Sequence, residues 1–278
     1  MTRPSRPRNR VPITVPDEPA PITEHLAELR KRIFWVLATL LLFTALAFSF
    51  AEQIFLFLLD PVVEVMDARG SKLQAISPTE TFFTYLKAAL LAGFMASLPV
   101  TFWHLWAFIS PGLYAQERRA VIPFVVVSSL LFAGGAIFGY TQVFPLVFEF
   151  LSGFDTSGLI EQSWTMSLAF STTARLFLAF GVAFELPILI FFLAVTGIVS
   201  ARKLWSGTPY AVLGIFVTAA VLTPPDFVSQ VLLAIPMLVL YLIGVGVAWL
   251  FDPERRRERR QDEEGESPTP SESEDHSE

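Results

Sequence analysis

Three glutamates stand in sequence contexts where a carboxylate could do chemistry. Glu28 lies in the charged segment 21–32, which leads directly into an apolar run. Glu117 immediately precedes a pair of arginines, and Glu185 interrupts a long apolar run. A carboxylate at a partly dehydrated interface suits a guanidinium ligand, because the planar guanidinium can donate two parallel hydrogen bonds to it. Glu28 and Glu117 could therefore converge on one basic ligand.

Both of these glutamates also have a purely structural interpretation. Glu28 and Arg32 are four residues apart, which predicts an ion pair worth about 0.2–0.5 kcal/mol on a helix. Glu117 begins an expected helix, where the helix dipole stabilises a carboxylate by about 0.3–1 kcal/mol. Arg30 and the basic residues beside it fit an ordinary membrane anchor. From spacing alone, the ion pair and the anchor are the preferred interpretation.

Glu185 lies near the middle of the apolar run 166–196, where an acid costs at least about 2.5–3.5 kcal/mol on insertion scales. A residue this costly is expected to face a partner or a functional site. Two alternatives stay open, a protonated carboxyl bonded to a neighbouring helix and an ion pair with Arg175. The ion pair is the weaker alternative, because ten residues of helix separate the two groups by about 15 Å. Arg175 is instead expected to extend to the far surface.

The composition is that of a membrane protein. Of the 278 residues, 53% are hydrophobic and 27 are Phe, and the mean hydropathy is +0.54. These values exceed those of soluble domains. The net charge of −6 is misleading, because eight acidic residues crowd positions 262–278, which contain no Lys or Arg.

Several function classes are excluded by what the sequence lacks. It has no cysteine, so disulfides, thiolate metal sites and cysteine nucleophiles are impossible. Its three histidines are not spaced as metal ligands, and no metal or cofactor is expected. No metalloprotease, serine hydrolase, P-loop or dinucleotide-binding motif occurs. We therefore expect neither an enzyme nor a nucleic-acid-binding protein.

Six apolar segments predict an all-α membrane protein with six transmembrane helices. The segments lie at about 33–50, 78–108, 116–150, 166–196, 209–222 and 228–251. Residues 51–77 are expected to form a loop. The fifth segment, at about 14 residues, would cover about 21 Å of a hydrocarbon core of about 30 Å. Helices five and six are both expected to be short, and either the fifth extends backwards or the bilayer thins beside it.

Basic residues predict the orientation of these helices. Sixteen lie on the side that holds both termini and three on the other side. The positive-inside rule then places both termini in the cytoplasm. Residues 1–21 are expected to be a disordered basic lead, 22–251 the membrane domain, and 252–278 a disordered acidic tail. Four tryptophans fit interfacial belts: Trp103, Trp106, Trp205 and Trp249.

Capping residues and prolines mark the expected helix ends. The segment 77–80, Ser-Pro-Thr-Glu, has the pattern of a capping box at the start of the second helix. A carboxylate after two prolines is expected to cap the sixth helix. The residues with expected structural roles are Pro61, Pro111, Pro224, Pro225 and Asp226. Gln230 is a polar group near a helix end that could simply satisfy a neighbour.

Five blocks of residues, taken in order, resemble the TatC family of the twin-arginine protein translocase. They are His25-Leu26-x-Glu28-Leu29-Arg30-x-Arg32, Ser77-Pro78-Thr79-Glu80, Trp106-x-Phe108-Ile109-x-Pro111-x-Leu113-Tyr114-x-x-Glu117-Arg118-Arg119, Phe184-Glu185-Leu186-Pro187 and Leu222-Thr223-Pro224-Pro225-Asp226-x-x-Ser229-Gln230. Each block alone is a weak signal, but five in order across residues 22–251 are specific. One departure is Leu242, where the family usually has an acid.

The resemblance implies a receptor that binds the twin-arginine signal peptides of folded cargo proteins at the cytoplasmic face. It implies that the signal-peptide site comprises Glu28, Arg30, Phe108 and Glu117, with the two glutamates holding the arginines. It also implies transport driven by the proton-motive force rather than by ATP. The absence of a nucleotide-binding motif agrees with this.

The resemblance also implies partners within the membrane. Glu185 and Gln230 would contact single-span subunits of the TatA and TatB type. Several copies of this chain would join them in a hetero-oligomeric complex in the lipid bilayer. The alternative functions are a proton-coupled secondary transporter using Glu185 and a purely structural scaffold. Broken helices at matching positions in two halves would support the transporter, but the short fifth segment has no counterpart in the first half.

Overall fold

Within a bilayer the backbone must satisfy its own hydrogen bonds, and the described chain does so through helices. The structure is a computed structural model that describes residues 22–67, 72–109, 121–153, 164–223 and 226–251. Across these residues, 5 helical segments are long and apolar enough to cross a membrane, and a shorter apolar helix spans Thr208–Leu222. The prediction of an all-α protein with six apolar spans is confirmed.

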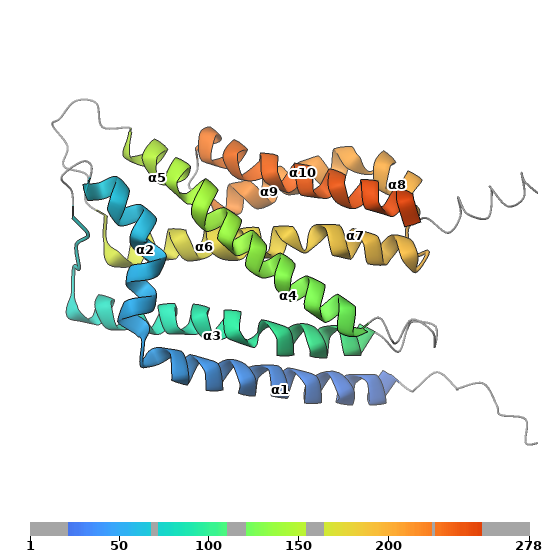
Figure 1. The fold of residues 1–278 in the computed structure, drawn as a ribbon, viewed down its shortest axis with the longest axis horizontal. Helices are drawn as coiled ribbons and strands as arrows, with labels where there is room; N and C mark the ends of the chain where they lie inside the picture. Colours follow the sequence, from blue (N-terminus) through green and yellow to red (C-terminus); the bar gives the residue numbers. More distant parts are fainter. Residues whose placement is uncertain (1–21, 68–71, 110–120, 154–163, 224–225, 252–278) are drawn as a thin grey trace, which may run out of the picture.

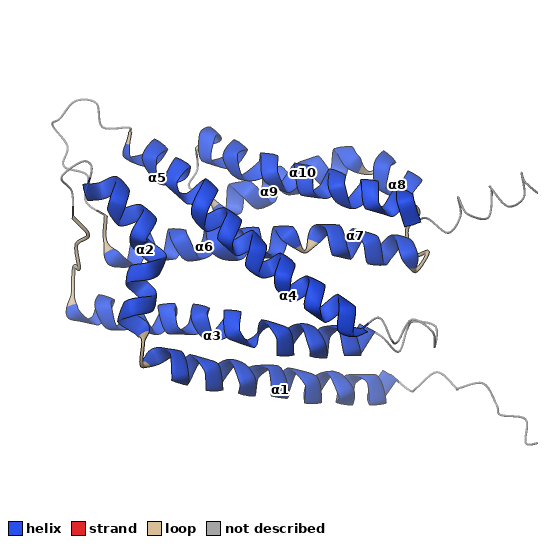
Figure 2. Cartoon of the chain, in the orientation of Figure 1, coloured by secondary structure: helices blue, strands red, loops and turns tan. Residues whose placement is uncertain are grey.

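The helices form a bundle that Figures 1 and 2 show from one side. In chain order they are α1 (Ile22–Phe48), α2 (Ala51–Asp67), α3 (Pro78–Ile109), α4 (Val121–Phe138), the π-helical segment η3 (Gly139–Val143), α5 (Phe144–Ser152), α6 (Met166–Phe184), α7 (Leu186–Val195), α8 (Ala201–Ser206), α9 (Thr208–Leu222) and α10 (Phe227–Phe251). Helix α1 lies at one edge and packs on α3, whereas α4 crosses obliquely and packs on both α3 and α6. Helix α10 packs on α7 and α9.

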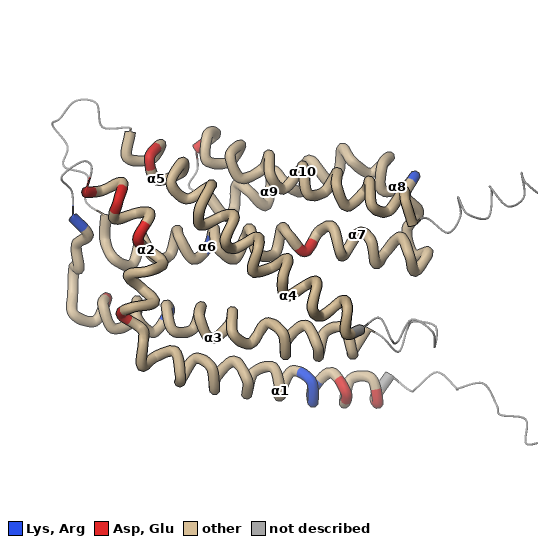
Figure 3. The backbone as a smooth tube through the Cα atoms, in the orientation of Figure 1, with Lys and Arg blue, Asp and Glu red and all other residues tan. Residues whose placement is uncertain are grey.

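The two ends of the bundle differ. Figure 1 shows that α1 begins, and that α3, α7 and α10 end, at the same end of the bundle, which we call the terminal face. The opposite face is the end where α1 ends and α3 begins. In Figure 3 the acidic residues gather on α2 and at the start of α1, and one acid lies at the junction of α6 and α7. That acid is Glu185.

The prediction of a loop over residues 51–77 is wrong, because 17 of these residues form α2. Its apolar side chains repeat at helical spacing and bury one face in the main core, as Phe55, Leu59 and Val62 show. Its acidic residues lie along the exposed face, and their presence in this stretch led to the prediction of a loop. Pro61, expected to have a structural role, lies inside this helix.

The third and fourth spans are both interrupted. The third changes from α4 to the π-helical η3, and Pro145 stands at the start of α5 that follows it. The fourth breaks at Glu185, and Pro187 stands at the start of α7. The two spans approach closely at Gly135, where an added Cβ would lie 2.7 Å from Phe184 Cγ. Glycine permits this contact because it has no side chain.

The last two helices differ in length. Helix α9 has 15 residues and is short, as predicted. Helix α10 has 25 residues, so the prediction that the sixth is also short is wrong; Pro236 lies inside it without ending it. Asp226 caps α10 as predicted, because its Oδ1 accepts a hydrogen bond from Ser229 N at 2.7 Å. Pro224 and Pro225 lie outside the described residues.

Trp106 is not a membrane-interface residue, contrary to the prediction. It is only 7% exposed and lies between α3 and α4. Its ring stacks on Phe124 with centroids 4.6 Å apart, and its Nε1 donates to Ser128 Oγ at 3.2 Å. The other three tryptophans of the predicted belt are exposed. Trp106 is therefore part of the packing that holds α4 on α3.

The predicted capping box forms and also joins two spans. Glu80 N donates to Ser77 Oγ at 3.2 Å, and Glu80 Oε2 accepts from Ile76 N at 2.8 Å. The other carboxylate oxygen, Oε1, accepts from Ser167 N at 2.9 Å. Glu80 therefore caps α3 and fastens the start of α6 beside it.

Replacing Glu80 by Ala should lower the melting temperature of the purified protein by a few degrees. The variant loses the acceptor for two backbone N–H groups at helix starts. Thermal unfolding in detergent measures the effect, with Glu64→Ala on the exposed face of α2 as the control. Equal melting temperatures for the two variants would show that the Glu80 carboxylate does not join the spans.

Candidate functional site

The start of α1 and the end of α3 meet at the terminal face, and this junction contains three of the residues named from the sequence. Helix α1 can lie close to α3 because Gly93 faces Thr44, and an added Cβ at Gly93 would lie 2.6 Å from Thr44 N. The close contact continues along both helices. It places Glu28 of α1 beside the last turn of α3, which includes Phe108.

Glu28 is paired with Arg32, as its i, i+4 spacing predicted. Arg32 Nε donates to Glu28 Oε1 at 2.9 Å, and Arg32 Nη2 donates to the same oxygen. Arg32 Nη2 also donates to Ala107 O at 3.2 Å, which ties α1 to α3. Within the described part of the chain, this is the only ion pair. Both hydrogen bonds that Arg32 donates to Glu28 end on Oε1, and Oε2 has no hydrogen-bond partner among the described residues, so it is available to a ligand.

His25 was not considered as part of this site, yet its ring covers Phe108. The two rings are stacked, with centroids 4.3 Å apart and planes inclined by 16°. His25 lies three residues before Glu28, on the same side of α1. The sequence feature that could have identified His25 is its position in the charged segment 21–32, one helical turn before Glu28. A carboxylate beside a stacked aromatic pair offers both an ionic and a flat apolar surface to a guanidinium.

The remaining predicted residues of the site fall in two groups. Arg30 lies on α1 and is exposed. Glu117 and Pro111 lie outside the described residues, in the segment that connects the end of α3 to the start of α4. Both of those helix ends lie at the terminal face. The meeting of Glu117 with Glu28 therefore stays a prediction.

Glu185 occupies a different place, in the break between α6 and α7. The residue is partly buried, and its Oε1 is buried without a hydrogen-bond partner among the described residues. The Ser128 hydroxyl and the backbone of Phe132, both on α4, are its polar neighbours. The predicted alternative of an ion pair with Arg175 does not form. An unsatisfied carboxylate oxygen in the middle of a span is costly, so this position is a candidate contact for a ligand or another protein chain.

Gln230 lies on α10 and bonds within the chain. Its Nε2 donates to Phe216 O on α9 at 3.0 Å, which joins the last two helices near the opposite face. The structure thus gives Gln230 a neighbour to satisfy, one of the two roles considered from the sequence. Its predicted contact with a partner subunit is a separate role.

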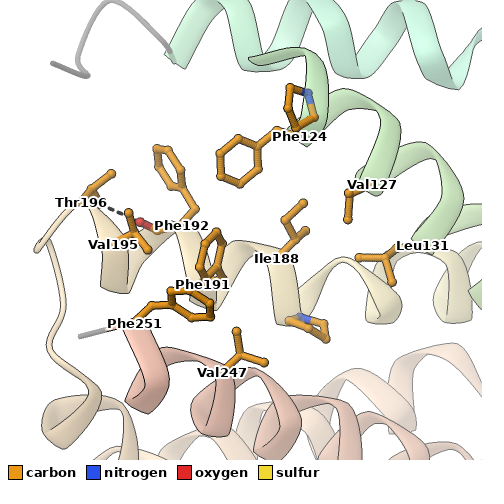
Figure 4. A pocket seen from close by; sticks show the side chains of 12 residues that line it. Phe124, Val127, Leu131, Ile188, Phe191, Phe192, Val195, Thr196, Val247 and Phe251 are labelled. Atoms are coloured by element: carbon orange, nitrogen blue, oxygen red, sulfur yellow. Dashed lines mark hydrogen bonds between the residues drawn. The ribbon is translucent and has the colours of Figure 1, made fainter. Parts of the chain in front are cut away.

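An apolar cavity of ≈ 560 Å³ lies between α4, α7 and α10, and neither Glu28 nor Glu185 lines it (Figure 4). Phe124, Phe191 and Phe251 point into it from the three helices. It offers no ionic partner, so it cannot bind a guanidinium.

The fold and these sites define a multi-pass helical membrane protein with a carboxylate–aromatic junction at one end and an unsatisfied acid within the bundle. The family model described as Sec-independent protein translocase protein (TatC) matches residues 24–236. The TatC protein of Koribacter versatilis (strain Ellin345) is 40% identical over 236 residues, covering 84% of this chain and 86% of the relative. That of Escherichia coli (strain K12) is 40% identical over 230 residues, covering 82% and 88%.

A solved structure agrees with these matches. The crystal structure of a twin-arginine translocase receptor, TatC, superposes with a TM-score of 0.74 at 36% identity, covering 82% of this chain and 99% of that one. The chain belongs to the TatC family of Sec-independent protein translocase components. The predicted family is confirmed, and the alternative of a secondary transporter gains no support from these matches.

The junction of α1 and α3 predicts an efficient cross-link between cysteines in place of His25 and Phe108. The native chain has no cysteine, so the engineered pair is the only one present. Stacked rings place the two side chains alongside each other, and a disulfide is expected to form on mild oxidation. Adding Arg32→Met should slow oxidation by about 1.4- to fivefold, because a partly exposed ion pair typically contributes about 0.2–1 kcal/mol.

Lys31→Met is the matched control, since Lys31 is the exposed neighbour of Arg32. Gel mobility after timed oxidation measures the rates. Equal oxidation rates for the two methionine variants would refute the role of Arg32 in holding α1 on α3.

Proposed function

We propose that the chain is the receptor that binds twin-arginine signal peptides of folded proteins, with Glu28 and Glu117 as the carboxylates that hold the two arginines. The observation that carries the proposal is the contact between Glu28 and Arg32. One carboxylate oxygen of Glu28 already accepts two hydrogen bonds from a guanidinium at the α1–α3 junction. An arginine of the peptide would use Oε2 or displace Arg32 from the same oxygen.

The surroundings of Glu28 support an arginine ligand over a lysine ligand. The stacked rings of His25 and Phe108 form a flat surface beside the carboxylate, and guanidinium stacks on such surfaces better than ammonium does. Arg30 is exposed on the same helix and belongs to the proposed site. Together with the basic anchor, it sets the depth of α1 at the cytoplasmic surface.

The proposal includes an orientation and a compartment. Both termini lie in the cytoplasm, the terminal face is the cytoplasmic face, and the membrane is the inner membrane of a bacterium. The asymmetry of basic residues supports this, with sixteen of the 20 Lys and Arg on that side. Residues 1–21 and 252–278 then extend from the membrane domain into the cytoplasm.

As a translocase component, the chain works with other subunits of that system. We propose that these are single-span subunits of the TatA and TatB type, joined with several copies of this chain. Glu185 is the proposed contact, because its unsatisfied Oε1 lies in the break between α6 and α7. A hydroxyl or protonated acid on a partner helix would satisfy it. Gln230 is a second proposed contact, and transport is driven by the proton-motive force.

Replacing Glu28 or Glu117 by Ala should weaken twin-arginine peptide binding by about ten- to a hundredfold, because each charged hydrogen-bonded contact is worth about 1.5–3 kcal/mol. Charge reversal to Lys should weaken it further, because like charges repel. Fluorescence anisotropy with a labelled signal peptide and the full-length protein measures the affinity. Glu24→Ala is the control, since Glu24 is an exposed acid one turn earlier on α1. Undiminished affinity in the double Ala variant would refute the site.

Replacing Glu185 by Gln should reduce cross-linking to the single-span subunits while leaving twin-arginine peptide binding unchanged. The amide keeps the shape of the side chain but removes its acid, so a partner that depends on the acid is lost selectively. Site-specific cross-linking in membranes measures the contact, and Ser129→Ala on α4 is a nearby control. If partner cross-linking and export were both untouched in Glu185→Gln, the acid would have no role in assembly.

A further inference from the structure

A second cavity carries an arrangement of charges that the proposed function does not use. It has a volume of ≈ 470 Å³ and lies between α1, α3 and α6. Its walls are largely apolar and include Leu40 of α1, Phe94 of α3 and Leu178 of α6. Two basic residues also line it, Lys87 from α3 and Arg175 from α6.

The two positive charges have no counter-ion within the described protein. Both Lys87 and Arg175 are exposed, and neither forms an ion pair with a described carboxylate. No acidic residue lines the cavity, whereas Ser171 adds a hydroxyl donor. Two cations on facing helices above an apolar cavity form a site for a molecule with an anionic head and a hydrocarbon body.

The depth of these residues fits a lipid head group. Lys87 and Arg175 each lie nine residues from the start of their helices, which begin at the opposite face, so each is about 14 Å along its helix. Both helical spans are longer than the hydrocarbon layer of about 30 Å requires. Long basic side chains directed towards the opposite face therefore bring their charges to the edge of that layer.

We propose that this cavity binds a phospholipid of the leaflet at the opposite face. The phosphate lies between Lys87 and Arg175, where several acceptor oxygens can take hydrogen bonds from both cations and from Ser171. An acyl chain lies along the apolar walls beneath them. A carboxylate on a partner helix fits less well, because it could satisfy the charges but would leave the apolar cavity between the helices unfilled.

The lipid would give α1 a second contact within the bundle. In the protein alone α1 packs on α3, and only 6% of its apolar window is buried. A hydrocarbon chain in the cavity contacts Leu40 of α1 on one side and Leu178 of α6 on the other. It therefore joins α1 to the rest of the bundle on the side that α3 does not cover.

Native mass spectrometry of the full-length protein tests the proposal, with phosphatidylglycerol added to delipidated protein in detergent. The double variant Lys87→Gln/Arg175→Gln should retain about tenfold less lipid than the native chain, because two cations near a membrane surface each contribute to anion binding. The matched control is Arg202→Gln/Lys203→Gln, which removes two exposed basic residues of α8 and should leave retention unchanged.

A third variant tests the contribution of the lipid's acyl chain separately from that of its head group. Ala174→Trp fills the apolar part of the cavity while keeping both charges, and it should also lose the lipid. If the double variant fails to fold, lipid retention by Ala174→Trp still tests whether the cavity binds the lipid. Soluble glycerol phosphate should not compete with the lipid, because it lacks the acyl chains. Equal lipid retention in the double variant and its control would overturn the proposal. So would binding of glycerol phosphate as tight as that of the lipid, or loss of a co-purified partner chain with lipid unchanged.

Discussion

The packing of α1 along α3 is the contact on which the candidate site depends. Helix α1 has few other neighbours, so its position is set where Gly93 lets the two backbones approach beside Thr44. At the terminal face the same contact is completed by Arg32, which reaches from Glu28 to Ala107 O. The ion pair predicted as an ordinary helix feature thus has a second consequence, because it holds the carboxylate beside Phe108.

Much of the fold follows from the sequence because the membrane restricts the choices. Apolar length and proline positions predicted the spans, and the capping patterns at Glu80 and Asp226 were correct to the residue. Helix α2 was missed because acidic residues and a proline in an apolar stretch are typical of a loop. The structure shows that Phe55 and Leu59 face the core. Trp106 was misplaced because tryptophan suits both an interface and a core, and the partner that decides between them, Ser128, is 22 residues away.

The site was predictable in residue type but not in geometry. Spacing predicted the Glu28–Arg32 pair, yet the bond from Arg32 to the end of α3 joins residues 75 apart and has no local signal. The stacking of His25 on Phe108 also joins residues that are far apart in the sequence. Glu185 was identified from its cost in an apolar run, and the structure adds that the helix breaks there and that one buried carboxylate oxygen has no hydrogen-bond partner among the described residues.

The central claim is that the α1–α3 junction at the terminal face receives a twin-arginine peptide. The most direct test is photo-cross-linking in membranes, with a photoreactive residue at Leu26, which is exposed on α1 between His25 and Glu28. A second protein carries the probe at Trp205 of α8, exposed at the same face but away from α1. We expect a cross-link from position 26 to a twin-arginine peptide, a much weaker one to a twin-lysine peptide, and none from position 205. Equal cross-linking from both positions, or equal yields with both peptides, would contradict the account.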